Sequence, residues 1–337
     1  IQAIQHNTGP CMVIAGPGSG KTTVLTHRVR YLIERYGVNP SDILVITFTK
    51  AAAEQMKLKF KGLSEGRNSA VTFGTFHAVF FTILKAAYNY SAHCIIKPQI
   101  QHEFVKDQMC RLELEYDDEN EAVAGVLSEI SCVKGEDVNI DEYESRCIPP
   151  QSFRIMYRAY DDMLVRKHLI DFDDMLLRCR DNLKKHEDVL ADVQETFHYI
   201  MIDEFQDTNN VQAEIFNMIA EKRKNICVVG DDDQSLYRFR GAKPEIMLDF
   251  EKTYPKTKKV VLNINYRSDR NIVAASKKFI EYNKTRFPKD IKSFHKRRYK
   301  IQLLQLPNDK EQNTWIIKKI NELYKKGVPY SEMAVIY

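Results

Sequence analysis

The sequence predicts an α/β protein built on a mostly parallel sheet, and three features support this class. Short apolar segments rich in β-branched residues, at residues 11–16, 43–48, 199–203 and 226–231, have the pattern of buried strands. Helical patterns separate them, and the one at residues 22–37 ends in a glycine, as expected for a C-cap. A glycine-rich stretch joins the first strand to the first helix. Strands that alternate with helices in this way form a parallel sheet with crossover helices.

A long segment near the middle of the chain breaks this alternation. Residues 77–196 have mostly helical patterns, with only a few loop signals such as CIPPQS at residues 147–152. We therefore expect a first α/β domain in two parts, residues 1–76 and 197–262, with a helical subdomain inserted between them. Residues 263–337 would begin a second α/β domain.

Composition indicates an ordinary globular protein. The chain has 337 residues, of which 44% are hydrophobic and 28% charged, so it can form two or three domains. No apolar run approaches the ~20 residues that a membrane span needs, and the first residues lack the pattern of a secretory signal. The seven cysteines are scattered without a Cys-x-x-Cys pair, which favours reduced thiols and a cytoplasmic location.

The charge is unevenly distributed. The net charge is only +4, but residues 277–300 contain ten Lys or Arg and two acidic residues, whereas residues 113–121 are strongly acidic. A basic face can bind phosphate groups. Taken alone, however, each charged run is best explained as solvated surface.

The glycine-rich stretch AGPGSGKTT has the composition of a phosphate-binding loop. It follows a strand and opens a helix, so backbone N–H groups and the positive end of the helix dipole can face an anion. Lys21 would contact the β- and γ-phosphates, and Thr22 would bind Mg²⁺. The alternative is a glycine-rich turn that happens to carry a lysine. The candidate nucleotide-binding residues are Ala15, which replaces the first glycine of the usual pattern, Gly16, Pro17, Gly18, Ser19, Gly20, Lys21, Thr22 and Thr23.

A second signal is the stretch YIMIDEFQD, in which a buried strand ends in acidic residues. An unpaired buried carboxylate is costly, so these groups need a cation. Asp203 would hold Mg²⁺ through water, and Glu204 would orient or deprotonate the attacking water. For Asp207, capping of the next helix is an equally good explanation. Together with the glycine loop, these acids predict that the cation is magnesium on a nucleoside triphosphate.

The stretch VVGDDDQSLYRFRGA is a third strand that ends in polar residues. Gln234 is placed to touch the γ-phosphate or the attacking water. Tyr237, Phe239 and Arg240 alternate aromatic and basic side chains, a pattern that suits single-stranded nucleic acid, although both rings are equally well explained as core. Further along, Tyr266 and Arg267 follow another strand, and this arginine could act on the transition-state charge.

Seven motifs together resemble the superfamily 1A DNA helicases, the group of UvrD, Rep and PcrA. They occur in the family's order and span nearly the whole chain: AGPGSGKT, VITFTKAAAEQM, FGTFHA, IDFDDML, YIMIDEFQDTNNVQ, GDDDQSLYRFRGA and NYRS. The resemblance implies two RecA-like lobes with Mg-ATP between them. It also implies movement 3′ to 5′ on single-stranded DNA and unwinding at junctions of single- and double-stranded DNA.

The resemblance also assigns residues to two sites. On the ATP side it implies Lys21, Thr22, Asp203, Glu204 and Gln234, with Tyr266 stacked on adenine and Arg267 as an arginine finger. On the DNA side it implies Phe48, Thr75, His77, Tyr237, Phe239 and Arg240. Phe48 and Phe76 are individually also explained as core.

The last residues, EMAVIY, resemble the first strands of the second lobe, and the later motifs of the family do not follow. We therefore expect the N-terminal part of a larger protein, able to bind nucleotide but impaired in hydrolysis and unwinding. Two alternatives stay open: an ATP-gated module that binds single-stranded DNA without motor activity, and the helicase part of a helicase–nuclease of the RecB and AddA kind. For the oligomeric state, the sequence allows a monomer or a weak dimer.

Overall fold

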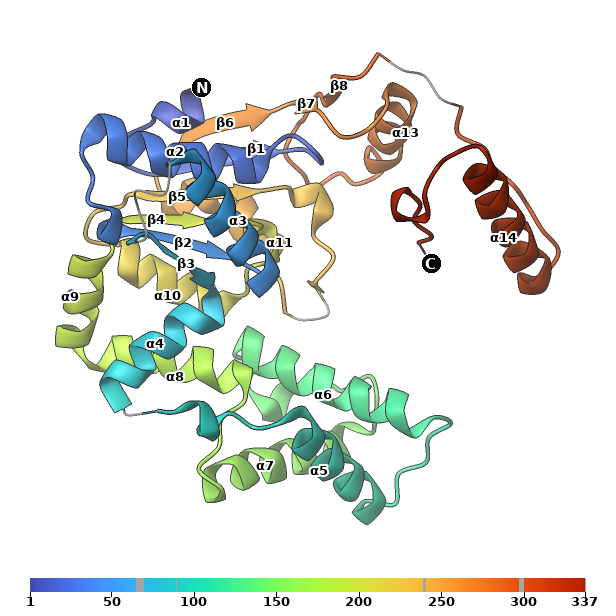
Figure 1. Ribbon diagram of the computed structural model, residues 1–337. Helices are drawn as coiled ribbons and strands as arrows, with labels where there is room; N and C mark the ends of the chain where they lie inside the picture. The colour runs from blue at the N-terminus through green and yellow to red at the C-terminus, as the bar shows by residue number, and fades with distance from the viewer. Residues whose placement is uncertain (65–69, 89, 239–240, 297–299, 337) are drawn as a thin grey trace. The chain divides into compact units, whose positions relative to one another are not determined.

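The predicted strands pair into one parallel sheet. The computed structural model describes residues 1–64, 70–88, 90–238, 241–296 and 300–336. The strand order is β3-β2-β4-β5-β1-β6, and all neighbouring strands are parallel (Figure 1). The predicted α/β class with a parallel sheet is confirmed. The strands are β1 Cys11–Ala15, β2 Ile43–Thr47, β3 Thr72–Thr75, β4 Tyr199–Ile202, β5 Ile226–Gly230 and β6 Lys258–Leu262.

The central strands contribute side chains to two separate cores. In β1, Val13 belongs to one hydrophobic cluster, whereas Met12 and Ile14 belong to another. This follows from the period of two in a strand, which sends successive side chains to opposite faces. Every residue of β1, β2 and β5 is buried. Continuous apolar runs are therefore required, as expected for a parallel sheet covered on both faces.

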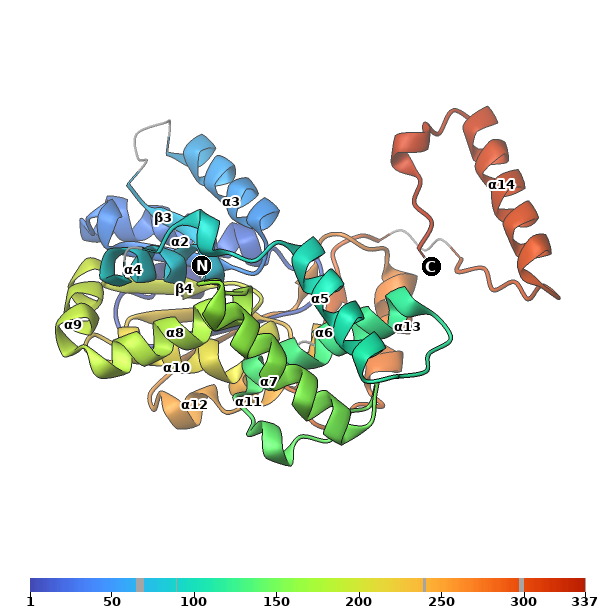
Figure 2. The same cartoon turned by 90° about the horizontal axis from the view of Figure 1, so that it is seen from below.

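Helices cover each face of the sheet (Figure 1 and Figure 2). On one face, α2 buries Leu25, Val29 and Leu32, which share one side of the helix, and α3 adds Met56 and Phe60. On the other face, α4, α8, α10, α11 and α12 supply the apolar side chains. The helices flanking the sheet are α1 Gln2–Gln5, α2 Lys21–Tyr36, α3 Lys50–Leu63, α4 Phe76–Tyr88, α8 Phe172–Lys185, α9 Glu187–Thr196, α10 Asn210–Ala220, α11 Pro244–Leu248 and α12 Phe250–Thr253.

The predicted boundaries are close to the observed ones. Each of the four predicted strands ends one residue earlier in the structure, because the next residue already turns away from the sheet. The helix predicted at residues 22–37 is α2, and Gly37 caps it in the left-handed conformation with φ 66°. The N–H of Gly37 donates to the carbonyl of Leu32, so the predicted glycine C-cap is confirmed.

The segment predicted to be helical divides between two cores. Its remaining helices are α5 Pro98–Arg111, α6 Glu119–Glu136 and α7 Pro150–Arg166. These three pack around their own cluster, which includes Val105, Val126 and Phe153. In contrast, α4 and α8 share the core of the sheet through residues such as Phe80 and Met175. Helices α4 and α8 are thus the base from which α5, α6 and α7 extend.

Short elements follow the sheet. They are β7 Ile264–Asn265, α13 Arg270–Ile280, β8 Lys292–Ser293 and α14 Asp309–Lys325. Among the described residues, the 3-10 helices are η1 Pro40–Asp42, η2 Ala92–Cys94, η3 Ile140–Glu142, η4 Phe205–Asp207, η5 Asp232–Gln234 and η7 Tyr330–Glu332. Strands β7 and β8 form a separate parallel pair.

Contacts between Cα atoms divide the chain into two compact units, residues 1–296 and 297–337. The second unit contains α14 and a stacked pair of rings, Tyr324 and Tyr330, whose centroids lie 4.3 Å apart. The domain boundaries expected from the sequence stay predictions. In the structure, each of the seven cysteines is unpaired with another cysteine. Within the described ranges, the chain contains no helix with the length and apolar character required to span a bilayer.

Candidate functional site

The glycine loop between β1 and α2 has the backbone that an anion-binding loop needs. Gly18 and Gly20 have φ values of 61° and 89°, which side chains other than glycine rarely adopt. Ser19 closes the loop, because its N–H and its hydroxyl both donate to the carbonyl oxygen of Gly16, at 3.3 and 2.6 Å. Helix α2 begins at Lys21, so its first N–H groups lie at the end of this loop.

The loop also packs closely against the residues after β7. The N–H of Tyr266 donates to the carbonyl oxygen of Gly18 at 2.9 Å. A Cβ atom on Gly18 would lie only 2.6 Å from the Cβ of Arg267, so the close approach requires glycine. Asn265 holds this turn, since its Oδ1 accepts hydrogen bonds from the N–H groups of Arg267 and Ser268, at 2.8 and 2.7 Å. The structure therefore brings Tyr266 and Arg267 to the glycine loop.

The acidic residues after β4 lie next to the loop lysine. The Lys21 ammonium is 2.7 Å from Glu204 Oε2, and the Lys21 side chain is 13% exposed. Glu204 has φ 50°, a left-handed conformation that costs of order 1–2 kcal/mol for a residue with a Cβ. Its N–H donates to Asp203 Oδ1 at 3.0 Å. In this structure, therefore, the cation facing the carboxylates is Lys21.

Two carboxyl groups of the site have raised pKa values. Burial, together with the charge of Glu204, raises the pKa of Asp203 to about 6, although Lys21 opposes the shift. The same two causes raise the pKa of Asp207 to about 7. Carboxylate and hydroxyl oxygens are the hard ligands that Mg²⁺ prefers, and Mg²⁺ keeps several waters, so Asp203 and Thr22 fit such an ion. A bound divalent cation would favour the ionised form of Asp203.

A glutamine that the sequence analysis did not single out connects the strand ends. Gln206 donates to Glu204 Oε2 at 3.0 Å and to Asp207 Oδ2 at 3.1 Å. The side-chain oxygen of Gln206, Oε1, accepts a hydrogen bond from the N–H of Asp231 at 2.9 Å. The sequence contained one sign of this role: Gln206 stands between Glu204 and Asp207 in the stretch YIMIDEFQD, where a buried amide could bind both acids. Asn209, and not Asp207, caps α10, so the capping alternative for Asp207 is wrong.

Gln234 is the last residue of η5, the short helix after β5, and lies on the wall of a cavity of about 530 Å³ that Pro17 and Asn265 also line. Its side-chain amide donates to Asp231 Oδ2 at 2.5 Å. The remaining residues predicted to bind nucleotide lie at the two ends of the glycine loop. Ala15 is the buried last residue of β1, and Thr22 and Thr23 lie in the first turn of α2, where Thr23 accepts a hydrogen bond from Lys59 at 2.7 Å.

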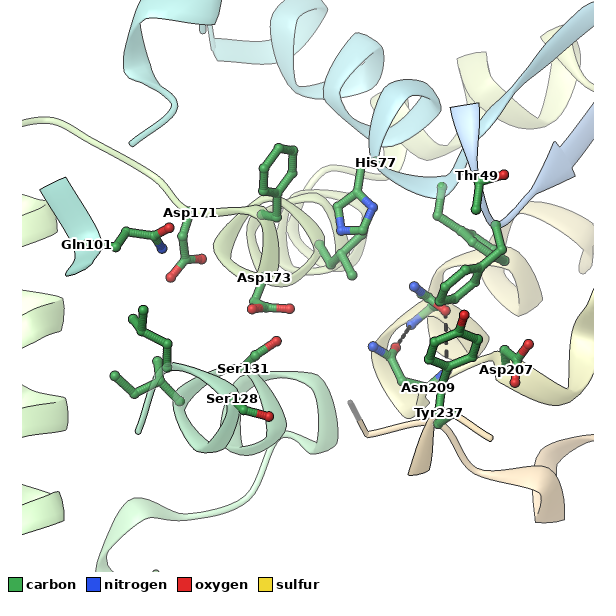
Figure 3. Close-up of a pocket in the computed structure, with 18 of the residues that line it drawn as sticks. Thr49, His77, Gln101, Ser128, Ser131, Asp171, Asp173, Asp207, Asn209 and Tyr237 are labelled. Carbon is green, nitrogen blue, oxygen red and sulfur yellow. Dashed lines mark hydrogen bonds between the residues drawn. The ribbon is translucent and has the colours of Figure 1, made fainter. Parts of the chain in front are cut away.

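A second cavity, of about 670 Å³, collects several of the predicted DNA-binding residues (Figure 3). Phe48, His77 and Tyr237 line it, and the rings of Phe48 and Tyr237 are stacked with centroids 5.2 Å apart. Phe48 and Tyr237 are therefore only partly buried, whereas Phe76 is 3% exposed and belongs to the core. Thr75 caps the start of α4 through a hydrogen bond from Ala78 N–H at 3.2 Å. The predicted residues Phe239 and Arg240 lie outside the described residues.

The opposite wall of this cavity comes from α6 and α8, where Ser131 points toward Asp173 (Figure 3). Burial, followed by the charge of Asp171, raises the pKa of Asp173 to about 7. Burial lowers the pKa of His77 to about 4, against the influence of Asp171. At neutral pH the cavity therefore presents a neutral imidazole, aromatic rings and a carboxyl group that is partly protonated.

The motif IDFDDML supplies this wall and anchors it. Phe172 and Asp173 line the cavity, and Asp171 and Asp174 bind the buried ammonium of Lys134, at 2.9 and 2.7 Å. Lys134 comes from α6, so the motif fastens α6 to α8. Among the described residues, no group of three or more His, Cys, Asp or Glu is arranged to hold a metal.

Comparisons with known proteins agree with this geometry. The family model of the UvrD/REP helicase N-terminal domain matches residues 1–255, and that of the UvrD-like helicase C-terminal domain matches residues 260–337. The chain is 33% identical over 348 residues to the ATP-dependent DNA helicase PcrA of Staphylococcus epidermidis. It is 34% identical over 350 residues to the putative ATP-dependent DNA helicase YjcD of Bacillus subtilis.

These alignments include all of this chain, but only 47% of the PcrA sequence and 45% of YjcD. The chain thus spans about half the length of the curated relatives it matches. The family model for the N-terminal domain alone covers most of the chain, and the resemblance predicted from the motifs is confirmed. This chain is a member of the UvrD-like helicase family.

Proposed function

We propose that this chain carries the ATP-hydrolysing site of a DNA helicase that moves 3′ to 5′ along single-stranded DNA and separates the duplex at junctions. The observation that supports this most is the Lys21–Glu204 ion pair of 2.7 Å. It joins the glycine loop to the acidic end of β4, at the carboxyl edge of a parallel sheet, where α/β proteins bind nucleotides. Of the relatives named above, PcrA is named an ATP-dependent DNA helicase and YjcD a putative one.

The ion pair suggests how substrate binding would prepare the site. The Lys21 ammonium would exchange Glu204 for the β- and γ-phosphates of Mg-ATP, a charge-assisted contact of the same kind. Glu204 would then lose its cationic partner and be available to accept a proton from the attacking water. Thr22 and Asp203 would hold the magnesium of the substrate, which offsets the negative charge of the phosphates.

Three further residues complete the proposed ATP site. Gln234 would contact the γ-phosphate or the water, and its place beside Pro17 on one cavity wall supports this role. Arg267 would stabilise the charge of the transition state, and its backbone already packs on Gly18. Tyr266, half exposed and in ring contact with Phe294, would stack on the adenine.

On the DNA side, we assign the second cavity to single-stranded DNA. Bases would stack on the rings of Phe48 and Tyr237, and His77 would supply a neutral hydrogen-bonding edge. Thr75 lies one residue before α4, and Phe239 and Arg240 follow Tyr237 in the chain. We expect the protein to act in the cytoplasm, as a monomer or weak dimer, on the single strand next to a duplex.

The central test changes Glu204 to Gln in the complete protein. Glu204→Gln should keep Mg-ATP binding and slow turnover at least ~100-fold, because a general base contributes roughly 10²–10⁴-fold. Glu214→Gln is a matched control, since Glu214 is a partly exposed acid paired with Lys184 on α8. Binding is measured with a fluorescent ATP analogue and turnover by phosphate release with single-stranded DNA present.

Equal losses of binding and turnover would contradict the proposed role of Glu204. The same assays separate the alternatives. A DNA-binding module without motor activity would bind both ligands but show no turnover stimulated by DNA. A helicase–nuclease would also cleave the DNA strand.

A further inference from the structure

Three consecutive aspartates after β5 surround one buried lysine. The Lys289 ammonium lies 2.5 Å from Asp231 Oδ1, 2.6 Å from Asp232 Oδ1 and 2.8 Å from Asp233 Oδ2. The Lys289 side chain is 0% exposed, although it comes from the basic run at residues 277–300. The interpretation of that run as solvated surface is therefore wrong at this position. A side chain so deeply buried requires a specific reason.

Neighbours of Lys289 bind the same acidic turn. Arg286 forms a fork on Asp233, with Nε 2.7 Å from Oδ1 and Nη2 2.6 Å from Oδ2. The N–H of Phe287 donates to Asp232 Oδ2 at 2.8 Å. Each aspartate is thus held by at least one group from the segment between α13 and β8. The segment and the end of β5 form one polar contact.

Charges in this contact are nearly balanced. Three carboxylates face two cations, which leaves one negative charge. Burial by itself would lower the pKa of Lys289, but the three aspartates raise it. Burial would raise the pKa of Asp233, but hydrogen bonds from Arg286 and Lys289 lower it. Both partners are therefore charged near neutral pH.

Asp231 connects this contact to the proposed ATP site. Its Oδ1 binds Lys289, and its Oδ2 accepts the hydrogen bond from the Gln234 amide at 2.5 Å. Its N–H donates to Gln206, which in turn donates to Glu204, the partner of Lys21. The two oxygens of one rigid carboxylate thus face Lys289 and Gln234. Rotation of that carboxylate would displace the Gln234 amide.

We propose that Lys289 is a positioning residue for ATP hydrolysis: it fixes the Asp231 carboxylate and, through it, the side-chain amide of Gln234. The proposal rests on the proposed function of the site and names how one of its residues is oriented. Lys289 itself binds no substrate group. Because Lys289 lies between α13 and β8, a shift of that segment would be transmitted to Gln234.

The test removes Lys289 without changing the charge of the cluster. Lys289→Met alone would leave three carboxylates with one cation, so it is combined with Asp232→Asn, which restores the wild-type balance of one negative charge. Asp232 does not bind Gln234. Lys292→Met is the control, because Lys292 is 71% exposed, pairs only with Asp290 among the described residues and lies three residues away. Lys289→Gln with Asp232→Asn is a second balanced pair, should methionine not be accommodated.

We call the double variant Lys289→Met with Asp232→Asn the balanced variant. In the complete protein, it should lower kcat for DNA-stimulated ATP hydrolysis about 10- to 100-fold, the usual cost of a misplaced group. KM for ATP should change less than about threefold, because ground-state binding is not removed. In a Gln234→Ala background the same change should have less than about a twofold effect, since both residues act through one amide. The proposal would be overturned if the balanced variant had the same kcat as wild type. It would also be overturned if the double change lowered kcat as much in the Gln234→Ala background as in the wild-type background.

A second measurement does not depend on turnover. Hydrogen exchange at residues 230–236 of the nucleotide-free protein should be at least about tenfold faster in the balanced variant than in wild type, with the glycine loop unchanged. Unchanged exchange at residues 230–236 would refute the positioning contact. If exchange responds but wild-type protein shows no DNA-stimulated turnover, the proposed function fails and the positioning contact stands.

Discussion

Two buried lysines, Lys134 and Lys289, have almost the same surroundings in different parts of the molecule. Each ammonium binds three aspartate carboxylates, at 2.7–3.0 Å for Lys134 and 2.5–2.8 Å for Lys289, and each side chain is at most 1% exposed. Burial opposes the charge of both lysines, whereas the carboxylates raise both pKa values. Local electrostatics alone therefore does not distinguish them.

Their connections do distinguish them. The partners of Lys134 lie on α7 and at the start of α8, where Asp171 also accepts a hydrogen bond from Asp174 N–H at 2.7 Å, so this network ends within the helices. The network of Lys289 continues through Asp231 to Gln234 and the loop lysine. A buried ion pair thus fastens helices in one region and orients a reacting group in the other.

The largest expected effect is on stability, at Lys134. Lys134→Met leaves the buried Asp171, the mostly buried Asp174 and the 41% exposed Asp161 without this cation, and breaking a buried pair in this way costs about 3–5 kcal/mol. The free energy of unfolding should fall by that amount in urea titrations at pH 7. ATP turnover per folded molecule should stay close to wild type, because no ion pair of Lys134 within the described part of the chain reaches the ATP site.

Asp174→Asn added to Lys134→Met is the control for charge, and it should recover part of the lost stability. A more than tenfold loss of kcat in the folded fraction of Lys134→Met would contradict the comparison. It would mean that the ion pairs of Lys134, like those of Lys289, are coupled to ATP hydrolysis.

Sequence reasoning located the proposed ATP site that the network of Lys289 reaches. The glycine loop and the acids after β4 and β5 could be located because the carboxyl ends of parallel strands meet at one edge of a sheet. Their contact, Lys21 with Glu204, joins residues 183 positions apart. The strand pattern predicts that these residues lie at one edge of the sheet, but not the ion pair itself, because the sequence pointed to magnesium as the cation. The sheet and its helices follow from the same periodicity.

The two buried lysines could not be found in this way. Lys289 binds Asp231 across 58 residues, and Lys134 binds Asp171 across 37. Neither lysine is marked by a strand end or by a spacing within one helix, so only tertiary packing reveals it. In a basic run, a lysine is ordinarily exposed. Lys292, from the same run, does follow that expectation.

A smaller effect is expected on DNA affinity, in the cavity of Figure 3. Tyr237→Ala should weaken binding of a single-stranded oligonucleotide by ~1–3 kcal/mol, the range for loss of one stacking ring. The affinity for an ATP analogue should not change. Tyr237→Phe, which keeps the ring beside Phe48, is the matched control and should retain binding. Affinity is measured by fluorescence anisotropy at fixed salt, and equal affinity for all three proteins would remove Tyr237 from the DNA site.

The smallest effect concerns the pH dependence of stability at Asp173, on the wall of the same cavity. In the folded protein burial and Asp171 raise its pKa to about 7, from 3.8. An acid with a raised pKa destabilises the folded state as pH rises between these two values, because the unfolded chain ionises first. Asp173→Asn lacks this ionisation, so its stability relative to wild type should increase by roughly 1 kcal/mol from pH 5 to pH 6.

Urea titrations of both proteins at several pH values measure this difference, with Asp107→Asn on α5 as the control for an exposed aspartate. The charges of Lys134, Asp171 and Asp174 also act on the pKa of Asp173. Both proteins in this comparison must therefore keep Lys134. A relative stability that is flat with pH would mean that Asp173 ionises as readily in the fold as in the unfolded chain. The wall would then be charged at neutral pH and would repel the phosphates of DNA. A rising difference supports a wall that is partly neutral and compatible with a stacked base.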